Sequence, residues 1–240
     1  MTAPVSAIAE NIERVRGRIA RAAQRCGRRA DDIAVIAVSK TFPAAAIRAA
    51  YDAGLRAFGE NRVQEFEAKS RELADLSGIV WHMIGHVQGN KARRATHLFH
   101  RIDSVDSTAL AKKLDDAASQ EEKKLPVLIE VHLGDESTKS GVDESAAPQL
   151  ANLLSTLTHV ELRGLMTIPP YFDSPENARP YFRRLRNLRD RLRSIPSRPL
   201  PVLSMGMSHD FEVAIEEGAT EIRVGSAFFG DRPPAAHAHE

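Results

Sequence analysis

One lysine stands where a nucleophilic amine would be useful. Lys40 follows Ser39 at the end of the apolar run 33–38, which reads Ile-Ala-Val-Ile-Ala-Val. An exposed lysine with a pKa of ~10.4 carries a neutral amine in only about one molecule in 2,500 at pH 7. Partial burial or a neighbouring cation would lower that pKa and free the amine to form an imine with an aldehyde. The position alone is equally consistent with a solvated lysine that ends a strand.

Two short segments near the end of the chain combine glycine with serine. They are 205–208 (Met-Gly-Met-Ser) and 223–226 (Arg-Val-Gly-Ser). Small residues let backbone N–H groups approach an anion closely, and the hydroxyls of Ser208 and Ser226 add hydrogen-bond donors. Ordinary turn glycines would give the same pattern. If both segments bind phosphate and Lys40 is reactive, the ligand is a phosphorylated aldehyde.

Short β-rich runs alternate with stretches of helical periodicity along most of the chain. The runs are 33–39, 57–59, 80–84, 101–105, 126–131, 160–166, 201–204 and 221–224, and the helical stretches are 43–53, 60–76, 88–96, 107–122, 145–157, 175–194 and 208–217. Strands separated by helices pair in parallel, either in an open doubly wound sheet or in a closed barrel. The count of strands favours the barrel. We therefore predict an α/β fold, a single (β/α)8 TIM barrel.

An additional helix is expected before the first strand. Apolar residues recur every three or four positions over 5–26, which is typical of a helix with one buried face. Only a short segment follows Gly230, so the last strand lacks a crossover helix to cover it. We predict that the helix 5–26 packs across the seam between the first and last strands. Residues 1–230 then form one domain, and 231–240 form a disordered tail.

The barrel brings the reactive residues together. In parallel barrels the functional side chains gather where the strands end, and the loops after strands seven and eight commonly hold phosphate. Lys40 follows the first strand, and the segments 205–208 and 223–226 follow the seventh and eighth. The same end of the barrel would therefore carry both the amine and the phosphate loops.

Composition limits the classes of partner. Lys and Arg number 33 against 32 Asp and Glu, so there is no overall positive field to attract nucleic acid or anionic lipid. No apolar run reaches the roughly 18 residues that would suggest a membrane span. One cysteine and a start without a signal-peptide pattern are consistent with a cytoplasmic protein.

Two other patterns suggest chemistry but have simpler interpretations. His82 and His86 are spaced as a helical metal pair would be, yet they flank the end of a strand, so a structural role is favoured over metal binding. The stretch 179–193 is rich in arginine, which could form an acidic-partner or nucleic-acid surface. Its apolar residues form a helical stripe, so we expect the arginines to be the solvated face of a barrel helix.

Several motifs follow one another in a fixed order from about Ile33 to Gly230. They are Ala37-Val38-Ser39-Lys40, Phe58-Gly59-Glu60-Asn61, the segment 81–91, Ser104-Val105-Asp106-Ser107, the segment 137–141, Gly164-Leu165-Met166-Thr167, Leu203-Ser204-Met205-Gly206-Met207-Ser208 and Arg223-Val224-Gly225. In these motifs the chain resembles the pyridoxal 5′-phosphate (PLP) homeostasis proteins of the YggS/PROSC type. The resemblance covers nearly the whole chain.

The resemblance implies a barrel similar to the N-terminal barrel of alanine racemase, with PLP held as a Schiff base on Lys40. The implied cofactor-binding residues are Lys40, Asn61, Met207, Ser208, Arg223, Gly225 and Ser226. Ser208, Gly225 and Ser226 would hold the phosphate, and Arg223 would face the pyridine nitrogen. Lys139, in the loop after the fifth strand, is a candidate secondary contact or simply a solvated lysine.

Two arguments favour a PLP carrier without turnover. A guanidinium at Arg223 would keep the pyridine nitrogen unprotonated and weaken the ring as an electron sink. None of the tyrosines, Tyr51, Tyr171 and Tyr181, is expected at a strand end, where a second acid or base would be needed. We expect a monomer that serves intracellular vitamin B6 homeostasis and exchanges PLP with apo-enzymes. A PLP-dependent racemase or lyase with one-sided chemistry, and an interaction protein using the arginine-rich helix, are the alternatives.

Overall fold

Parallel strands form the centre of the molecule. The computed structural model describes residues 5–134, 140–193 and 199–231, and the structural statements below concern these residues. The strands are β1 (Ala34–Val38), β2 (Ala57–Glu60), β3 (Val80–Met83), β4 (Arg101–Val105), β5 (Leu125–His132), β6 (Val142–Asp143), β7 (Val160–Met166), β8 (Val202–Ser204) and β9 (Glu221–Val224). All but β6 pair in the order β4-β3-β2-β1-β9-β8-β7-β5, and a β4–β5 pairing closes the ring. The predicted eight-stranded parallel barrel is confirmed.

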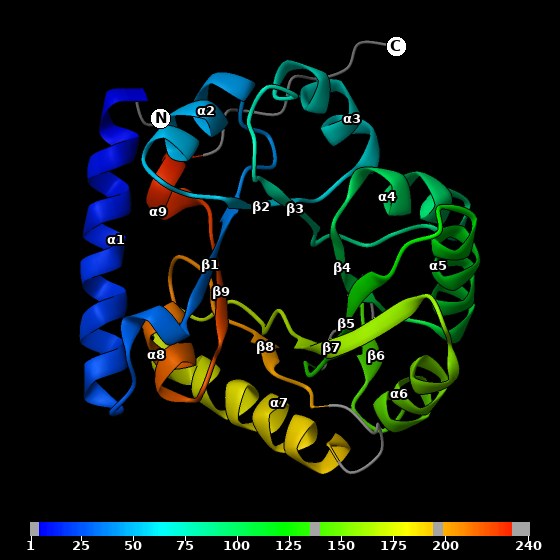
Figure 1. The fold of residues 1–240 in the computed structure, drawn as a ribbon. Helices are drawn as coiled ribbons and strands as arrows, with labels where there is room; N and C mark the ends of the chain where they lie inside the picture. The colour runs from blue at the N-terminus through cyan, green and yellow to red at the C-terminus, as the bar shows by residue number, and fades with distance from the viewer. Residues whose placement is uncertain (1–4, 135–139, 194–198, 232–240) are drawn as a thin grey trace.

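Helices surround the barrel on its outside (Figure 1). They are α1 (Val5–Arg25), α2 (Ala44–Asp52), α3 (Val63–Glu72), α4 (Ala92–Leu98), α5 (Thr108–Gln120), α6 (Ala147–Thr156), α7 (Arg179–Leu192), α8 (Phe211–Glu216) and α9 (Ser226–Phe229), with 3-10 turns η1 (Ala30–Asp32), η2 (Gly89–Lys91) and η3 (Pro175–Ala178). Two predicted helices, 88–96 and 175–194, thus start as 3-10 turns. The helix predicted over 208–217 begins only at Phe211, because residues 205–210 form the loop that reaches the end of the barrel.

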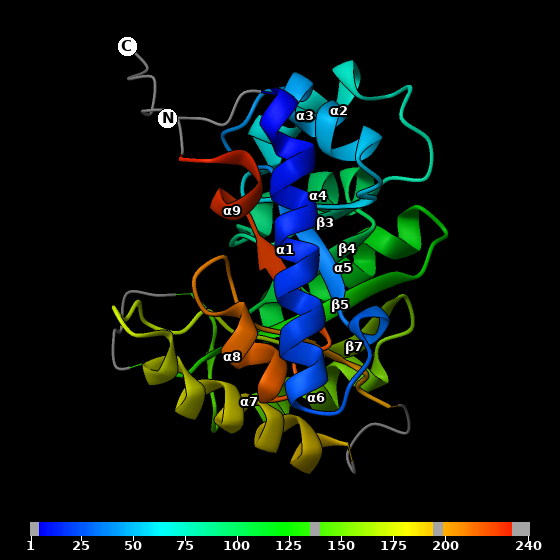
Figure 2. The same ribbon diagram turned by 90° about the vertical axis from the view of Figure 1, so that its left-hand side faces the viewer.

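Helix α1 covers the side of the barrel where β1 and β9 pair. Its apolar stripe, including Ile8, Ile12, Val15 and Ile19, is buried. The stripe packs on α2, α8 and α9, the helices that flank β1 and β9 (Figure 2). The predicted position of this helix is confirmed, although it contacts the flanking helices more than the strands themselves. Of the tail predicted to be disordered, 231–240, only Asp231 lies within the described residues.

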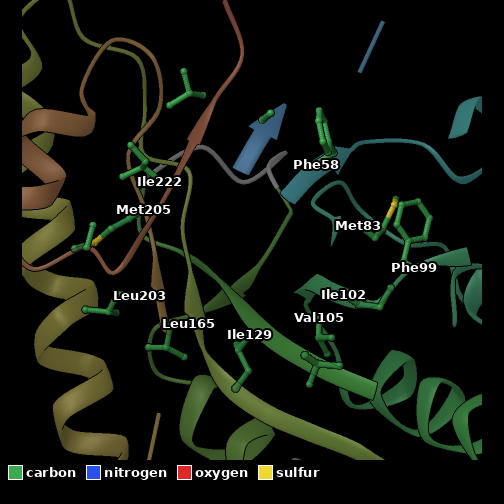
Figure 3. Packing of buried hydrophobic residues seen from close by; sticks show 14 of the residues in the cluster. Phe58, Met83, Phe99, Ile102, Val105, Ile129, Leu165, Leu203, Met205 and Ile222 are labelled. Carbon is green, nitrogen blue, oxygen red and sulfur yellow. The ribbon is translucent and has the colours of Figure 1, made fainter. Parts of the chain in front are cut away.

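The main hydrophobic core lies between the strands and the surrounding helices, and the barrel interior is charged at the end where the strands begin. Side chains on the outer faces of the strands pack in this layer with residues of the adjoining helices and loops, and Figure 3 labels Phe58, Met83, Phe99, Ile102, Val105, Ile129, Leu165, Leu203, Met205 and Ile222. Arg101, the first residue of β4, donates to Asp103 and to both carboxylate oxygens of Glu221, the first residue of β9. Since β4 and β9 are not neighbours in the ring, these side chains meet across the interior. The end with Lys40 is the opposite one.

Candidate functional site

A cavity of about 320 Å³ opens at the end of the barrel where the strands finish. It is lined by Val38, Lys40, Asn61, Ile84, Ile168, Tyr171, Met207, Ser208, His209, Arg223, Gly225 and Ser226. All the residues that the resemblance implies for cofactor binding, Lys139 aside, are therefore brought together. A larger hollow of about 540 Å³ lies between α6 and α7, but none of the predicted site residues lines it.

Lys40 is presented by a tight turn after β1. The amide of Ser39 donates to Gly59 O of β2 at 3.0 Å, which continues the parallel pairing by one residue. Thr41 then adopts a φ of 69°, in the left-handed region that a β-branched residue rarely enters. The Phe42 amide closes the turn on Ser39 O at 3.1 Å. Lys40 is half-buried at the apex of this turn, with its side chain on the cavity wall.

Arg223 is a buried, fixed cation in the wall of the cavity. It lies on β9 with 3 % exposure, and its two terminal nitrogens donate to Ser204 O and Oγ and to Thr167 O, each at 2.8 Å. Burial lowers the pKa of Arg223, while the carboxylates of Glu221, Asp103, Glu130 and Asp210 oppose that shift. A guanidinium stays protonated under all ordinary conditions. The side chain therefore keeps its charge and its orientation.

The two glycine-serine loops meet through Ser208. Its Oγ accepts hydrogen bonds from the amides of Gly225 at 3.2 Å and Ala227 at 3.3 Å. A Cβ on residue 225 would lie 3.3 Å from Val38 Cβ, so glycine lets the loop after β9 lie close to β1. These contacts gather a hydroxyl and backbone amides at one side of the cavity.

Gly206 has a different role from the one that the sequence suggested. It has a φ of 94°, and a Cβ there would lie 2.6 Å from Ala214 Cβ of α8. It does not line the cavity. The glycine is needed for the turn and for close packing against α8, and the approach to a ligand is left to its neighbours Met207 and Ser208.

Asn61 lies beside a glycine that makes room for it. It follows β2 and is half-buried. A Cβ on residue 85 would be 2.3 Å from Asn61 O and 2.6 Å from Asn61 Cγ. Gly85 in the loop after β3 therefore permits Asn61 to occupy the cavity wall.

Sequence reasoning missed several cavity residues, of which Tyr171 and His209 matter most. Tyr171 lies in a loop, as expected, but that loop follows β7 and brings the residue into the cavity lining. Its ring stacks on His209 with the centroids 5.4 Å apart. His209 Nε2 lies 3.1 Å from Phe172 O and 3.2 Å from Asp173 O, so it donates to this loop. The run Ile-Pro-Pro-Tyr directly after a strand end was the available signal.

The histidines set aside as structural each face an aspartate. His82 Nδ1 is 3.4 Å from Asp103 Oδ2 in the interior, and His86 Nδ1 is 2.7 Å from Asp106 Oδ2 near the mouth. Close to His86 and Asp106 lies Glu130 of β5, which is 6 % exposed. Burial and the charge of Asp106 raise the pKa of Glu130 to about 7, although Arg223 and His86 act in the opposite direction. The mouth thus carries a carboxyl group that titrates near neutrality.

The arginines of α7 are tied to acids of neighbouring segments. The core stripe of this helix is buried as predicted, with Phe182, Leu185, Leu188 and Leu192 at 1 % exposure or less. The arginines are not simply solvated: Arg179, Arg183 and Arg186 pair with Glu217, and Arg184 and Arg191 pair with Glu144. Three arginines share Glu217 and two share Glu144, so each is paired with an acid but the helix keeps an excess of positive charge.

Two further predictions concern regions beyond this site. Lys139 lies outside the described residues, so its role stays a prediction. Within the described ranges, every helix is too short or too polar to cross a membrane.

Comparison with known proteins identifies the family. The family described as alanine racemase, N-terminal domain, matches residues 5–233. The pyridoxal phosphate homeostasis protein of Aquifex aeolicus is 46% identical over 93% of this chain and 97% of its own length, and that of Escherichia coli K12 is 41% identical over 94% and 97%. The structure of PipY from Synechococcus elongatus with PLP bound matches with a TM-score of 0.84 and 41% identity, covering 93% of this chain and 100% of PipY.

More distant structures share the fold alone. Alanine racemase from Corynebacterium glutamicum is 19% identical, with a TM-score of 0.69 over 97% of this chain and 62% of the racemase. The part of the racemase beyond that match has no counterpart in the sequence given. By its sequence matches over nearly their full length, the chain belongs to the pyridoxal phosphate homeostasis proteins, which share the barrel of the alanine racemase N-terminal domain family.

Proposed function

We propose that this protein binds PLP in the cavity at the end of the barrel, with the cofactor joined to Lys40 as a Schiff base. The observation that carries the proposal is the meeting of Lys40, from the turn after β1, with the Ser208 and Gly225 loops in one cavity. The homeostasis proteins named above and the PLP-bound PipY structure support it. The role that follows is participation in intracellular vitamin B6 homeostasis.

The cavity suits the size and chemistry of this cofactor. Its volume of about 320 Å³ lies near the lower end of the range for small-molecule sites. Val38, Ile84 and Ile168 offer apolar walls for a flat ring, while the serine hydroxyls and loop amides offer donors for a dianionic phosphate. Bound PLP would supply an electrophilic aldehyde, and the amine of Lys40 is the nucleophile that matches it.

The residues divide the work of holding the cofactor. We assign the phosphate to Ser208, Gly225 and Ser226, and the pyridine nitrogen to Arg223. Asn61 and Met207 complete the walls. The Arg223 guanidinium is already bonded to Ser204 and Thr167, so it presents a fixed positive charge and gives up no proton. An unprotonated pyridine nitrogen makes a poor electron sink, which favours holding and exchange of PLP over catalytic turnover.

A PLP-dependent racemase or lyase is the second candidate, and one observation favours it. Tyr171 lines the cavity, so a phenol is present where a second proton donor or acceptor would be required. Tyr171 is 76% exposed and lies in a loop, which is a poor setting for a positioned acid or base. We therefore rank the carrier function above turnover.

We further infer that the protein works as a cytoplasmic monomer and exchanges PLP with PLP-dependent apo-enzymes. Lys40, Ser208, Gly225 and Arg223, to which the proposal assigns the cofactor, line one cavity of this chain. Sedimentation of the protein with and without PLP tests the monomer. Transfer to an apo-enzyme of known PLP dependence, followed by recovery of that enzyme's activity, tests exchange.

Borohydride trapping tests the central proposal. The protein is incubated with PLP, reduced, denatured and digested, and the peptides are weighed by mass spectrometry. A pyridoxyl adduct on the peptide that contains Lys40, lost in Lys40→Ala, is expected. Wild-type protein whose Lys40 peptide stays unmodified would refute the assignment. Sustained turnover of an amino acid at about 1 s⁻¹ or faster, sensitive to Tyr171→Phe, would instead establish the enzyme.

A further inference from the structure

A second lysine is buried directly behind the turn that presents Lys40. Lys69 lies on α3 with 8% exposure. Its Nζ has four oxygen atoms within hydrogen-bond distance: Ser39 O at 3.1 Å, Phe42 O at 3.3 Å, Glu60 Oε1 at 2.8 Å and Glu65 Oε1 at 3.1 Å. The two carbonyl oxygens belong to the residues that begin and end the Lys40 turn. A buried ammonium therefore holds both ends of the turn at once.

Glu65 holds the middle of the same turn. It lies one helical turn before Lys69 on α3, and its Oε1 accepts from the Thr41 amide at 2.6 Å. This is the residue whose left-handed φ of 69° is unfavourable for a side chain with a branched Cβ. Burial acts to raise the pKa of Glu65, but the Thr41 amide and the Lys69 ammonium hold that pKa below its usual value. The carboxylate is thus stabilised in the charged form that binds the turn.

Glu60 completes the cluster from the strand side. It is the last residue of β2 and is fully buried, and its Oε1 also accepts from Ser39 Oγ at 2.7 Å. Burial raises the pKa of Glu60, and Lys69 and Ser39 counteract that rise. Ser39, Thr41 and Phe42 are therefore all restrained, and Lys40 lies between them with its side chain on the cavity wall.

The free-energy cost of burying the charged groups of Lys69 and Glu60 suggests that the cluster has a role beyond folding. Burying an ammonium and a carboxylate costs solvation free energy that their mutual attraction rarely exceeds, so apolar side chains of similar volume would serve stability as well. The cluster instead fixes a strained backbone beside the residue proposed to react. We propose that Lys69, Glu65 and Glu60 are positioning residues that fix the 39–42 turn so that the Lys40 amine meets the aldehyde of the cofactor.

This inference rests on the proposed function, because it concerns the step in which Lys40 binds PLP. In that step the Lys40 nitrogen bonds to the aldehyde carbon, and the carbonyl oxygen leaves as water with two hydrogens from the amine. No oxidant or reductant is needed. The cluster touches neither reactant and acts only through the backbone of the turn.

Glu65→Ala is the main variant, because Glu65 is partly exposed and its loss should leave the fold intact. Glu67→Ala is the matched control: Glu67 lies on the same helix, its side chain is 34% exposed against 30% for Glu65, and it pairs with Arg94 away from the turn. Glu65→Gln keeps an oxygen that can accept from the Thr41 amide and serves as the conservative variant. Lys69→Met removes the ammonium itself.

Two forms of vitamin B6 distinguish a loss of Lys40 positioning from general damage to the cavity. PLP reports on covalent loading of Lys40, which is measured by absorbance and by the amount of borohydride-trapped adduct. Pyridoxine 5′-phosphate has an alcohol in place of the aldehyde, so its affinity reports on the cavity alone. We expect Glu65→Ala to slow PLP loading roughly tenfold or more, the effect of losing a hydrogen bond to a charged group. Pyridoxine 5′-phosphate affinity should stay within about twofold of wild type, and Glu65→Gln should recover part of the loading rate.

Hydrogen exchange in the ligand-free protein supplies an independent readout. Peptides covering residues 39–42 should exchange faster in Glu65→Ala and Lys69→Met but not in Glu67→Ala. Equal losses for PLP loading and pyridoxine 5′-phosphate binding would overturn the inference, since they would show a collapsed cavity. Normal loading in both Glu65→Ala and Lys69→Met would also overturn it while leaving the proposed function in place. Wild-type protein that never loads Lys40 would refute the proposed function itself.

Discussion

Ser208→Ala asks whether the loops after β8 and β9 hold a phosphate. Ser208 Oγ lies 3.2 Å from the amide nitrogen of Gly225 and 3.3 Å from that of Ala227, and it accepts from both. A hydroxyl that accepts two hydrogen bonds still has its own hydrogen to donate. A phosphate oxygen in the cavity could therefore receive a hydrogen bond from Ser208 and share the two amides.

The size of the effect follows from this geometry. A hydrogen bond to a charged group contributes about 1.5–3 kcal/mol, which corresponds to roughly a 10- to 150-fold change in Kd. In the alanine variant the Gly225 and Ala227 amides no longer have the serine oxygen as a competing acceptor. They are freer to bind the phosphate, which offsets part of the loss. We therefore expect PLP affinity to fall by roughly 10- to 30-fold.

Comparing PLP with pyridoxal isolates the phosphate contribution. Both carry the aldehyde that Lys40 would bind, but only PLP carries the phosphate. Kd for each is measured by absorbance titration with wild type, Ser208→Ala and Ser70→Ala; Ser70 is a control on α3 whose hydroxyl bonds Glu67 O. Ser208→Ala should weaken PLP and leave pyridoxal nearly unchanged. Equal weakening of both vitamers would refute a phosphate role for Ser208.

Three further predictions concern the mouth and interior of the barrel. Tyr171→Ala removes a ring stacked at the rim, worth about 0.5–1.5 kcal/mol, so pyridoxine 5′-phosphate should dissociate up to about tenfold faster in stopped-flow displacement. Arg101→Met leaves Asp103 and Glu221 buried without their cation and should lower the free energy of unfolding in urea by about 3–5 kcal/mol. Glu130→Gln should change the pH dependence of stability. The folded-state pKa of Glu130, about 7, lies above its ordinary value of 4.5. The stability that this carboxyl group contributes is thus fully present below pH 4.5 and is lost as pH rises through 7. The free energy of unfolding of Glu130→Gln should therefore exceed that of wild type by up to about 3 kcal/mol at pH 8, and by little at pH 4.5. A constant difference between the two pH values would contradict that reasoning.

The barrel could be predicted because short β-rich runs alternate with helical stretches, with turn signals between them. The run 33–39, for example, contains β1 at Ala34–Val38, and the run 221–224 coincides with β9. The apolar run 33–38 is typical of a strand buried on both faces, whereas β9 alternates apolar residues with Glu221 and Arg223, which face the interior. The two-residue β6 and the four-residue α9 leave no such pattern, because they are too short for a period and are held by tertiary contacts such as the pairing of Val131 with Val142.

The site could be predicted only in part, because some of its residues are placed by tertiary contacts and not by the ends of strands. Parallel strands all end at the same face, so the residues directly after them were predicted to meet, and the cavity contains Lys40 with the 207–208 and 225–226 loops. Tyr171 escaped this reasoning because it is several residues into a loop. Its position depends on a contact with His209 that no local pattern encodes. The arginines of α7 show the same limit, since a helix period reveals an outer face but not the acids that meet it.

The charged groups around the cavity differ in how firmly they are held, and this difference bears on function. The turn of Lys40 is bonded to β2 and α3 on both sides, and Arg223 is bonded at both terminal nitrogens. Tyr171, by contrast, is a residue with 76% exposure at the rim. Repeated proton transfer at a substrate carbon needs an acid or base held within hydrogen-bond reach, whereas reversible imine exchange needs only a well-placed amine and open access for the incoming one. A restrained turn that presents the amine beneath an exposed rim therefore agrees with the proposed carrier function.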